Sequence, residues 1–129
     1  MTYLLKMDFE GLYNKVMSLD LNVRFAIILN QSGERICGGF RENLKQFLTP
    51  DELSMVIYHA SHRWESRKHL AHKIGKAHYS MTEYDKVKRI AFPIDENHMM
   101  LISTEVFADH TKIINNVLNL IKMATANQG

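Results

Sequence analysis

The sequence has few of the residues that would cross-link the chain or place it in a membrane. Among its 129 residues Cys37 is the single cysteine, so an internal disulfide is impossible and zinc motifs built from several cysteines are excluded. No apolar run approaches the roughly 18 residues that a membrane-spanning helix requires. Acidic residues stand near the start of the chain, which is not typical of a signal peptide. We therefore expect a cytoplasmic protein.

The sequence also lacks recognisable catalytic motifs. It contains no H-E-x-x-H motif and no nucleophile elbow. Gly33, Gly38 and Gly39 match neither a P-loop nor a dinucleotide-binding fingerprint, because no Gly-Lys-Ser/Thr follows them. No cysteine–histidine catalytic arrangement is evident around Cys37, so a buried structural thiol is expected. The sequence therefore favours a protein that is not an enzyme and holds no cofactor.

The composition is that of a globular protein with one locally basic segment. Hydrophobic residues make up 46% of the chain, which is enough for one compact core, and we expect a single domain over residues 1–129. The formal net charge is only +2, but residues 59–78 contain five lysines and arginines against the single acidic Glu65. Because this basic patch is short and the overall charge is small, nucleic acid is not an expected partner.

The most distinctive stretch, residues 49–74, has the pattern of one long amphipathic helix. Thr49 suits the N-cap, Pro50 suits the first helical position, Glu52 completes a capping box, and Gly75 ends the helix. At about 100° per residue, one face is apolar and is expected to be buried. That face carries Leu53, Val56, Ile57, Ala60, Trp64, Ala71 and Ile74. The opposite face carries Met55, Tyr58, His59, His62, Glu65, His69 and His72.

Hydrophobic periodicity predicts the remaining elements. Helical spacing predicts a first helix over residues 3–18 and a last helix that is capped by Asp109 and frays over residues 125–129. Strands are predicted at 23–29, 34–38, 77–82, 87–94 and 99–102. The first and fifth of these are almost continuously apolar, which indicates cover on both faces and a central position in a sheet.

Placing the two apolar strands side by side predicts the topology. The element order is α-β-β-α-β-β-β-α, and the five-stranded antiparallel sheet has the strand order 2-1-5-4-3. The long helix then crosses one face of the sheet, and the first and last helices cover the other. Strand three is left at an edge. The predicted fold class is therefore α+β, a three-layer α/β/α domain.

This succession and strand order resemble the roadblock/LC7 group within the profilin-like and longin-like folds, over nearly the whole chain. A second resemblance rests on Arg24-Phe25, Asn30, Gly33, Gly38-Gly39-Phe40-Arg41, Arg67-Lys68, Ile74-Gly75 and Phe92-Pro93-Ile94. In these residues the chain resembles small archaeal proteins without an assigned activity, known mainly from ammonia-oxidising archaea. The roadblock resemblance implies a non-enzymatic homodimer that pairs strand three with strand three and packs its long helices side by side. It also implies a role in scaffolding or regulating small GTPases and motor complexes.

The histidines of the long helix allow three interpretations. His59/His62 and His69/His72 are each spaced i, i+3, so each pair offers two imidazoles to one metal ion. A stable zinc site needs three or four ligands, which a second copy of the helix would have to complete. The second interpretation is a solvated basic face. The third is a dimer interface that weakens as pH falls. Four residues are then expected near the seam: Met55, Tyr58, His62 and His69.

Arg67 is unusual because it falls near the middle of the apolar face, where an unpaired charge is costly. Three environments would make this position acceptable. The arginine could pair with a carboxylate, its side chain could reach water over Trp64, or it could form a small anion pocket together with Arg63 and Arg24. The last possibility predicts a small-molecule or anion sensor that uses the topology of profilin-like and PAS-like sensory domains.

Three classes of function therefore remain. The first is a homodimeric interaction or regulatory module, whose partners are a second copy of the chain and, by resemblance, a small GTPase. The second is the small-molecule or anion sensor with Arg24, Arg63 and Arg67 at its site. The third is a metal-binding protein that uses the histidine-bearing helix. A membrane partner is not expected.

Overall fold

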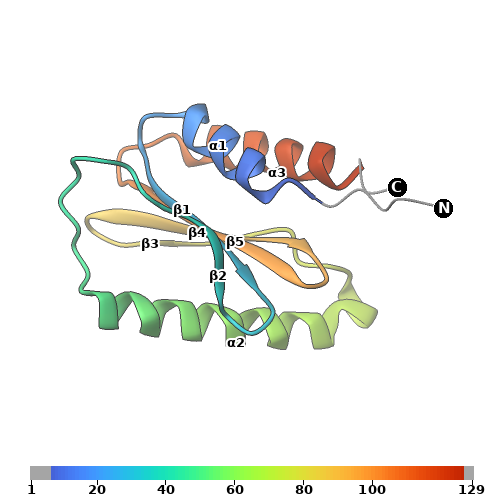
Figure 1. Cartoon of the computed structure of the whole chain (residues 1–129). Coiled ribbons are helices and arrows are strands. Elements are labelled where there is room, and N and C mark those ends of the chain that lie inside the picture. Colours follow the sequence, from blue (N-terminus) through green and yellow to red (C-terminus); the bar gives the residue numbers. More distant parts are fainter. Residues whose placement is uncertain (1–6, 127–129) are drawn as a thin grey trace.

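The computed structural model describes residues 7–126 and confirms the predicted α+β fold (Figure 1). Its elements in chain order are α1 (Phe9–Leu19), β1 (Val23–Asn30), β2 (Arg35–Phe40), α2 (Pro50–Ile74), β3 (Ser80–Glu83), β4 (Val87–Asp95), β5 (His98–Glu105) and α3 (His110–Ala126). The antiparallel sheet has the predicted order β2-β1-β5-β4-β3. In Figure 1, α2 runs along one face of the sheet while α1 and α3 lie together on the other.

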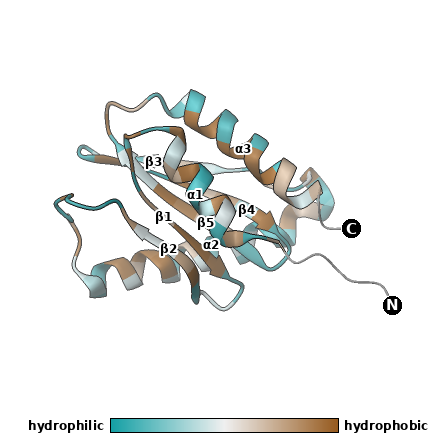
Figure 2. Cartoon of the chain, turned by 45° about the horizontal axis from the view of Figure 1, so that its top comes forward, coloured by the Kyte–Doolittle hydropathy of each residue, from teal (hydrophilic) through white to brown (hydrophobic). Residues whose placement is uncertain are grey.

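Each face of the sheet packs against its own helices, which produces two apolar clusters. On the α1/α3 side, Val16 and Val117 meet sheet residues such as Phe92. On the α2 side, Trp64 and Ala60 meet the sheet residues Phe25, Ile27, Leu29, Met99 and Leu101. Figure 2 shows apolar residues along the central strands and along one side of α3. The strands β1 and β5 supply residues to both clusters, which is why their sequences are apolar almost without interruption.

The start and stop signals of α2 are confirmed. The Thr49 hydroxyl accepts a hydrogen bond from the Glu52 N–H at 3.2 Å, and the Glu52 carboxylate accepts one from the Thr49 N–H at 2.9 Å. Gly75 follows the helix with a positive φ of 89°, and its N–H donates to the carbonyl of Ala71 at 2.8 Å. Local sequence therefore determines both ends of this helix.

The predicted burial of the apolar face of α2 is only partly correct. Ala60 and Trp64 are buried, but Ile74 is 81% exposed. A helix of 25 residues is about 37 Å long, whereas five strands span only about 20 Å across a sheet and about 30 Å along it. The last turn of α2 is therefore not covered by the sheet, and the prediction that Ile74 is buried is wrong.

Two strands have boundaries that differ from the prediction. β2 continues to Phe40, beyond the expected end at Gly38, because pairing with β1 extends to the end of the strand. β3 begins at Ser80, although alternation predicted a start at residue 77. Ser80 lies opposite Ala91, so His78 would have to pair with Pro93, which has no N–H to donate.

The other elements differ from prediction mainly at their ends. α1 begins after Asp8, whose side chain accepts a hydrogen bond from the Gly11 N–H at 2.8 Å, and the predicted residues 3–6 lie outside the described part. α3 follows Asp109 as expected but continues to Ala126, and residues 127–129 of the predicted frayed tail are not described. β5 continues to Glu105, beyond its predicted end at Ile102, because it pairs with β1 and β4 on either side.

In residues 7–126, no helix combines the length and apolarity needed to cross a bilayer.

Candidate functional site

The outward face of α2 carries exposed aromatic, methionine and histidine side chains. Met55 and Tyr58 are well exposed, as are the four histidines of this helix. The Tyr58 ring contacts His62 edge-on, with centroids 4.4 Å apart, and His59 at 5.5 Å. The predicted set Met55, Tyr58, His62 and His69 is therefore on the molecular surface.

Tyr58 and His62 lie on the side of α2 that faces the β1–β2 turn. With Ser61 they line a cavity of about 400 Å³ whose other wall contains Ser32 and Gly33. The Ser61 hydroxyl is buried without a hydrogen-bond partner among the described residues. This side of the helix is thus distinct from the flank on which Arg67 lies.

β3 forms an open edge of the sheet. Its four residues pair only with β4 among the described strands, and most of the strand is exposed. Half-exposed Tyr79 precedes it. An unpaired edge presents free N–H and C=O groups and is a template for a further strand.

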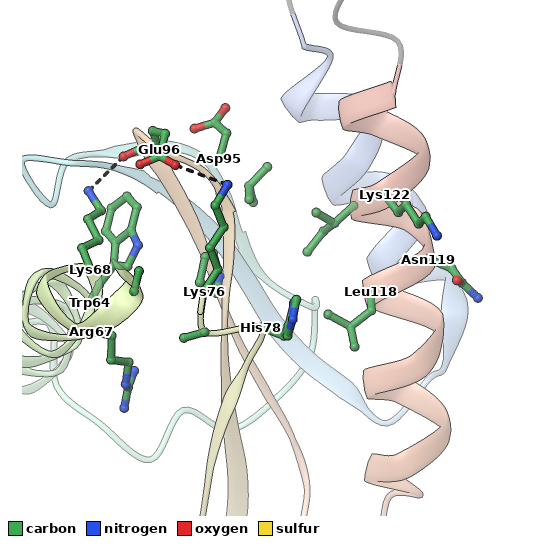
Figure 3. Close-up of a pocket in the computed structure, with 15 residues that line it drawn as sticks. Trp64, Arg67, Lys68, Lys76, His78, Asp95, Glu96, Leu118, Asn119 and Lys122 are labelled. Carbon is green, nitrogen blue, oxygen red and sulfur yellow. Dashed lines mark hydrogen bonds and ion pairs between the residues drawn. The ribbon is translucent and has the colours of Figure 1, made fainter. Parts of the chain in front are cut away.

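A cavity of about 520 Å³ lies beside the second half of α2, and we term it the α2–α3 cavity (Figure 3). Its lining comes from α2, the segment that leads into β3, the β4–β5 turn and α3. Lys68 of α2 lies 3.9 Å from the centroid of the Trp64 ring and donates a hydrogen bond to the Glu96 carbonyl at 2.9 Å. These contacts hold the C-terminal half of α2 against the β4–β5 turn.

Arg67 lines the α2–α3 cavity and is half-buried. Among residues 7–126, no hydrogen-bond acceptor, carboxylate or aromatic ring partners its guanidinium. Figure 3 shows the Arg67 side chain pointing away from Glu96. Of the three alternatives that the sequence left open, a carboxylate pair within the described chain does not form.

Arg24 lies elsewhere and has partners of its own. It is buried, forms an ion pair with Glu105, donates a hydrogen bond to the Lys45 carbonyl and lies 4.7 Å from the Phe47 ring centroid. It borders a separate, aromatic-lined cavity of about 470 Å³. Arg63 is exposed and lines neither this cavity nor the α2–α3 cavity. The fold does not bring the three arginines together.

The histidines and the cysteine do not form a site within one chain. In the described part of the chain, no three side chains of the types His, Cys, Asp and Glu are placed to hold a metal ion together. Cys37 is half-buried and packs beside the α1/α3 cluster. Burial raises the pKa of the Cys37 thiol, and the carboxylates of Glu10 and Asp8 raise it further, which suppresses the reactive thiolate.

Sequence reasoning missed the buried Lys88. Its ammonium donates to the Ala108 carbonyl at 2.8 Å and lies 2.8 Å from Nδ1 of His110, so it ties β4 to the start of α3. The alternation of β4 could have predicted this burial. Side chains two residues apart in a strand lie on the same face, so Lys88 lies on the core-facing side with Ile90 and Phe92.

The fold is similar to that of several solved structures. A roadblock/LC7 domain from Streptomyces avermitilis is similar with a TM-score of 0.68 at 14% identity, over 92% of this chain and 96% of that one. The gliding protein MglB from Thermus thermophilus has a TM-score of 0.73 at 9% identity, over 99% and 97%. MglC from Myxococcus xanthus has a TM-score of 0.63 at 9% identity, over 93% and 98%. The fold is that of roadblock/LC7 domains.

The chain itself matches the family DUF6659, a family of unknown function, over residues 5–122, and belongs to it. Comparison with curated proteins gives no match. The resemblance to small archaeal proteins stays a prediction.

Proposed function

We propose that this protein is a non-enzymatic, homodimeric interaction module. In the dimer, β3 pairs with β3 of a second copy and the two α2 helices pack side by side. Two observations carry the proposal: large apolar side chains are exposed on the long helix α2, and β3 leaves an open edge of the sheet. The large apolar side chains that are exposed on α2 belong to Met55, Tyr58, Leu70 and Ile74.

The seam is expected along the outward face of α2. Met55, Tyr58, His62 and His69 remain its proposed contacts, and the exposed Leu70 lies further along the helix. Burial of such side chains against a second copy supplies the driving force for association, at about 25 cal/mol per Å² of apolar surface. A solved relative described as MglB with tetrameric arrangement, with a TM-score of 0.69 at 10% identity, supports self-association of this fold.

The homodimer is proposed to bind another protein in addition to its own second copy. A small GTPase is the class of partner that the roadblock resemblance implies, and a cytoplasmic location goes with it. The dimer would present a continuous sheet and a pair of helices as a binding platform, a form of recognition that requires no catalytic group.

The oligomeric state tests the proposal. Light scattering coupled to size exclusion at micromolar concentration should give twice the 15.0 kDa of one chain at about pH 8. A strictly monomeric protein under these conditions would exclude the homodimer.

A matched pair of variants locates the seam. Met55→Asp should weaken association at least about tenfold, since it buries an unpaired carboxylate. Met123→Asp is the control, because Met123 on α3 is 63% exposed and Met55 on α2 is 59% exposed. Equal effects of the two substitutions would argue against a seam on α2.

A further inference from the structure

We propose that the α2–α3 cavity binds a small organic anion, with Arg67 as its principal cationic contact. This inference goes beyond the homodimer and does not depend on it, since the cavity is built from elements of one chain. It also differs from the anion site predicted from sequence, because neither Arg24 nor Arg63 takes part.

The size of the cavity suits a small molecule. Its volume of about 520 Å³ falls within the roughly 300–1,000 Å³ of typical ligand pockets. Inorganic phosphate alone would leave most of this volume unfilled. The cavity is a partly open hollow between α2, α3, the end of β4 and the segment before β3, which suits a small molecule better than a nucleic acid.

The walls combine an apolar surface with an excess of positive charge. The apolar part includes Ala71, Ala77, Pro93 and Leu118, from four different segments. The charged part contains four cations and two carboxylates: Arg67, Lys68, Lys76, Lys122, Asp95 and Glu96. A ligand with an apolar body and one negative group therefore complements both parts.

The two carboxylates already have partners in the protein. Asp95 accepts a hydrogen bond from the Asn97 N–H and lies 2.8 Å from Nδ1 of His98. The Glu96 carboxylate lies 3.6 Å from the Lys76 ammonium. The negative charge of the lining is thus engaged locally and does not neutralise Arg67.

Arg67 is the cation that most needs a partner. A half-buried guanidinium loses part of its hydration, and that loss is costly unless an anion replaces the water. A carboxylate, phosphate or sulfonate group accepts two parallel hydrogen bonds from a guanidinium. Lys122 on α3 also lines the cavity, but its side chain is exposed and points away from Arg67 in Figure 3, so Arg67 is the cation on which the site depends.

A pair of fluorescent probes tests the site. Anilinonaphthalene sulfonate carries an apolar aromatic body and one sulfonate, and phenylnaphthylamine is its uncharged counterpart. Titrated with each probe, the wild-type protein should bind the sulfonate more tightly. Arg67→Ala should weaken sulfonate binding about tenfold, as expected for one lost charged hydrogen bond, and leave the neutral probe unchanged.

Arg63→Ala is the matched control, since it removes the same charge from the same helix outside the cavity. Sulfonate affinity should change less than about twofold in this variant. The proposal is overturned if the sulfonate does not bind, if both arginine variants weaken it equally, or if Arg67→Ala weakens the neutral probe as much as the charged one.

Arg67→Lys provides a second test if Arg67→Ala does not fold, because it keeps the positive charge and removes the planar guanidinium. Sulfonate binding should weaken severalfold in this variant, with the neutral probe unchanged. Equal sulfonate binding by Arg67→Lys and wild type would in that case overturn the site. Light scattering on the same samples reports the dimer separately, so a failed ligand site and a failed homodimer give different results.

Discussion

Arg24 is a buried cation whose partner lies far away in the sequence. It pairs with Glu105, 81 residues later, and the Glu105 side chain is 24% exposed. Arg24→Met should lower the free energy of unfolding by about 3 kcal/mol, because removing one partner leaves the other charge partly buried and unpaired. Urea unfolding measures the change.

Arg63→Met is the control for this prediction, since Arg63 is exposed on α2 and makes no ion pair among the described residues. Its effect should stay within about 0.5 kcal/mol. A stability of Arg24→Met equal to that of the wild type would show that the ion pair with Glu105 is not a stabilising contact.

At the level of the element, the β1–β2 hairpin contains two adjacent glycines, Gly38 and Gly39, and only Gly38 has to be a glycine. Gly38 has a φ of +106°, and a Cβ there would lie 2.2 Å from the Ala26 carbonyl oxygen in β1. Gly38→Ala should therefore destabilise the protein by about 3 kcal/mol, from backbone strain and overlap together. Thermal and urea unfolding measure the loss.

Gly39→Ala is the neighbouring control. A Cβ at Gly39 would meet no atom within 4 Å, so its substitution should cost less than about 1 kcal/mol. Comparable losses at the two positions would mean that the close approach of β2 to β1 at Gly38 is not what requires glycine.

At the scale of the whole molecule, stability is expected to be uneven. β1 is buried along nearly its full length, whereas α2 contributes only Ala60 and Trp64 to the buried core. By hydrogen exchange at low protein concentration, amides of β1 and β5 should exchange slowest, and those of α2 should exchange faster through local opening. Equal protection of α2 and β1 under these conditions would contradict the prediction.

Raising the protein concentration extends this measurement to the proposed dimer. The amides of α2 and β3 should then gain protection, because association removes local opening at the seam, while those of α3 should not change. A gain confined to α3 would place any interface on the opposite face of the sheet.

Much of the fold was predictable because the hydrophobic pattern reports burial directly. Continuous apolar strands identified β1 and β5 as central, and the capping box of Thr49 and Glu52 marked the start of α2. The errors arose where pairing extended or shortened an element. Phe40 belongs to β2 because β1 pairs with it, and β3 starts late because Pro93 interrupts its partner.

The candidate site was less predictable. The sequence singled out Arg67 because a charge on an apolar face is visible in the helical period. It also grouped Arg67 with Arg24, although Arg24 already has Glu105 as its partner. The other residues that line the cavity, such as Lys76 and Leu118, come from segments whose side-chain placement no local pattern specifies.

The sequence by itself determined the order of the elements and the strands at the centre of the sheet, because periodicity, caps and turns are local. Only the tertiary structure decided which charges meet, how far α2 extends past the sheet and where cavities remain. Those properties depend on side chains that are distant in sequence and on the relative lengths of packed elements, which no short segment encodes.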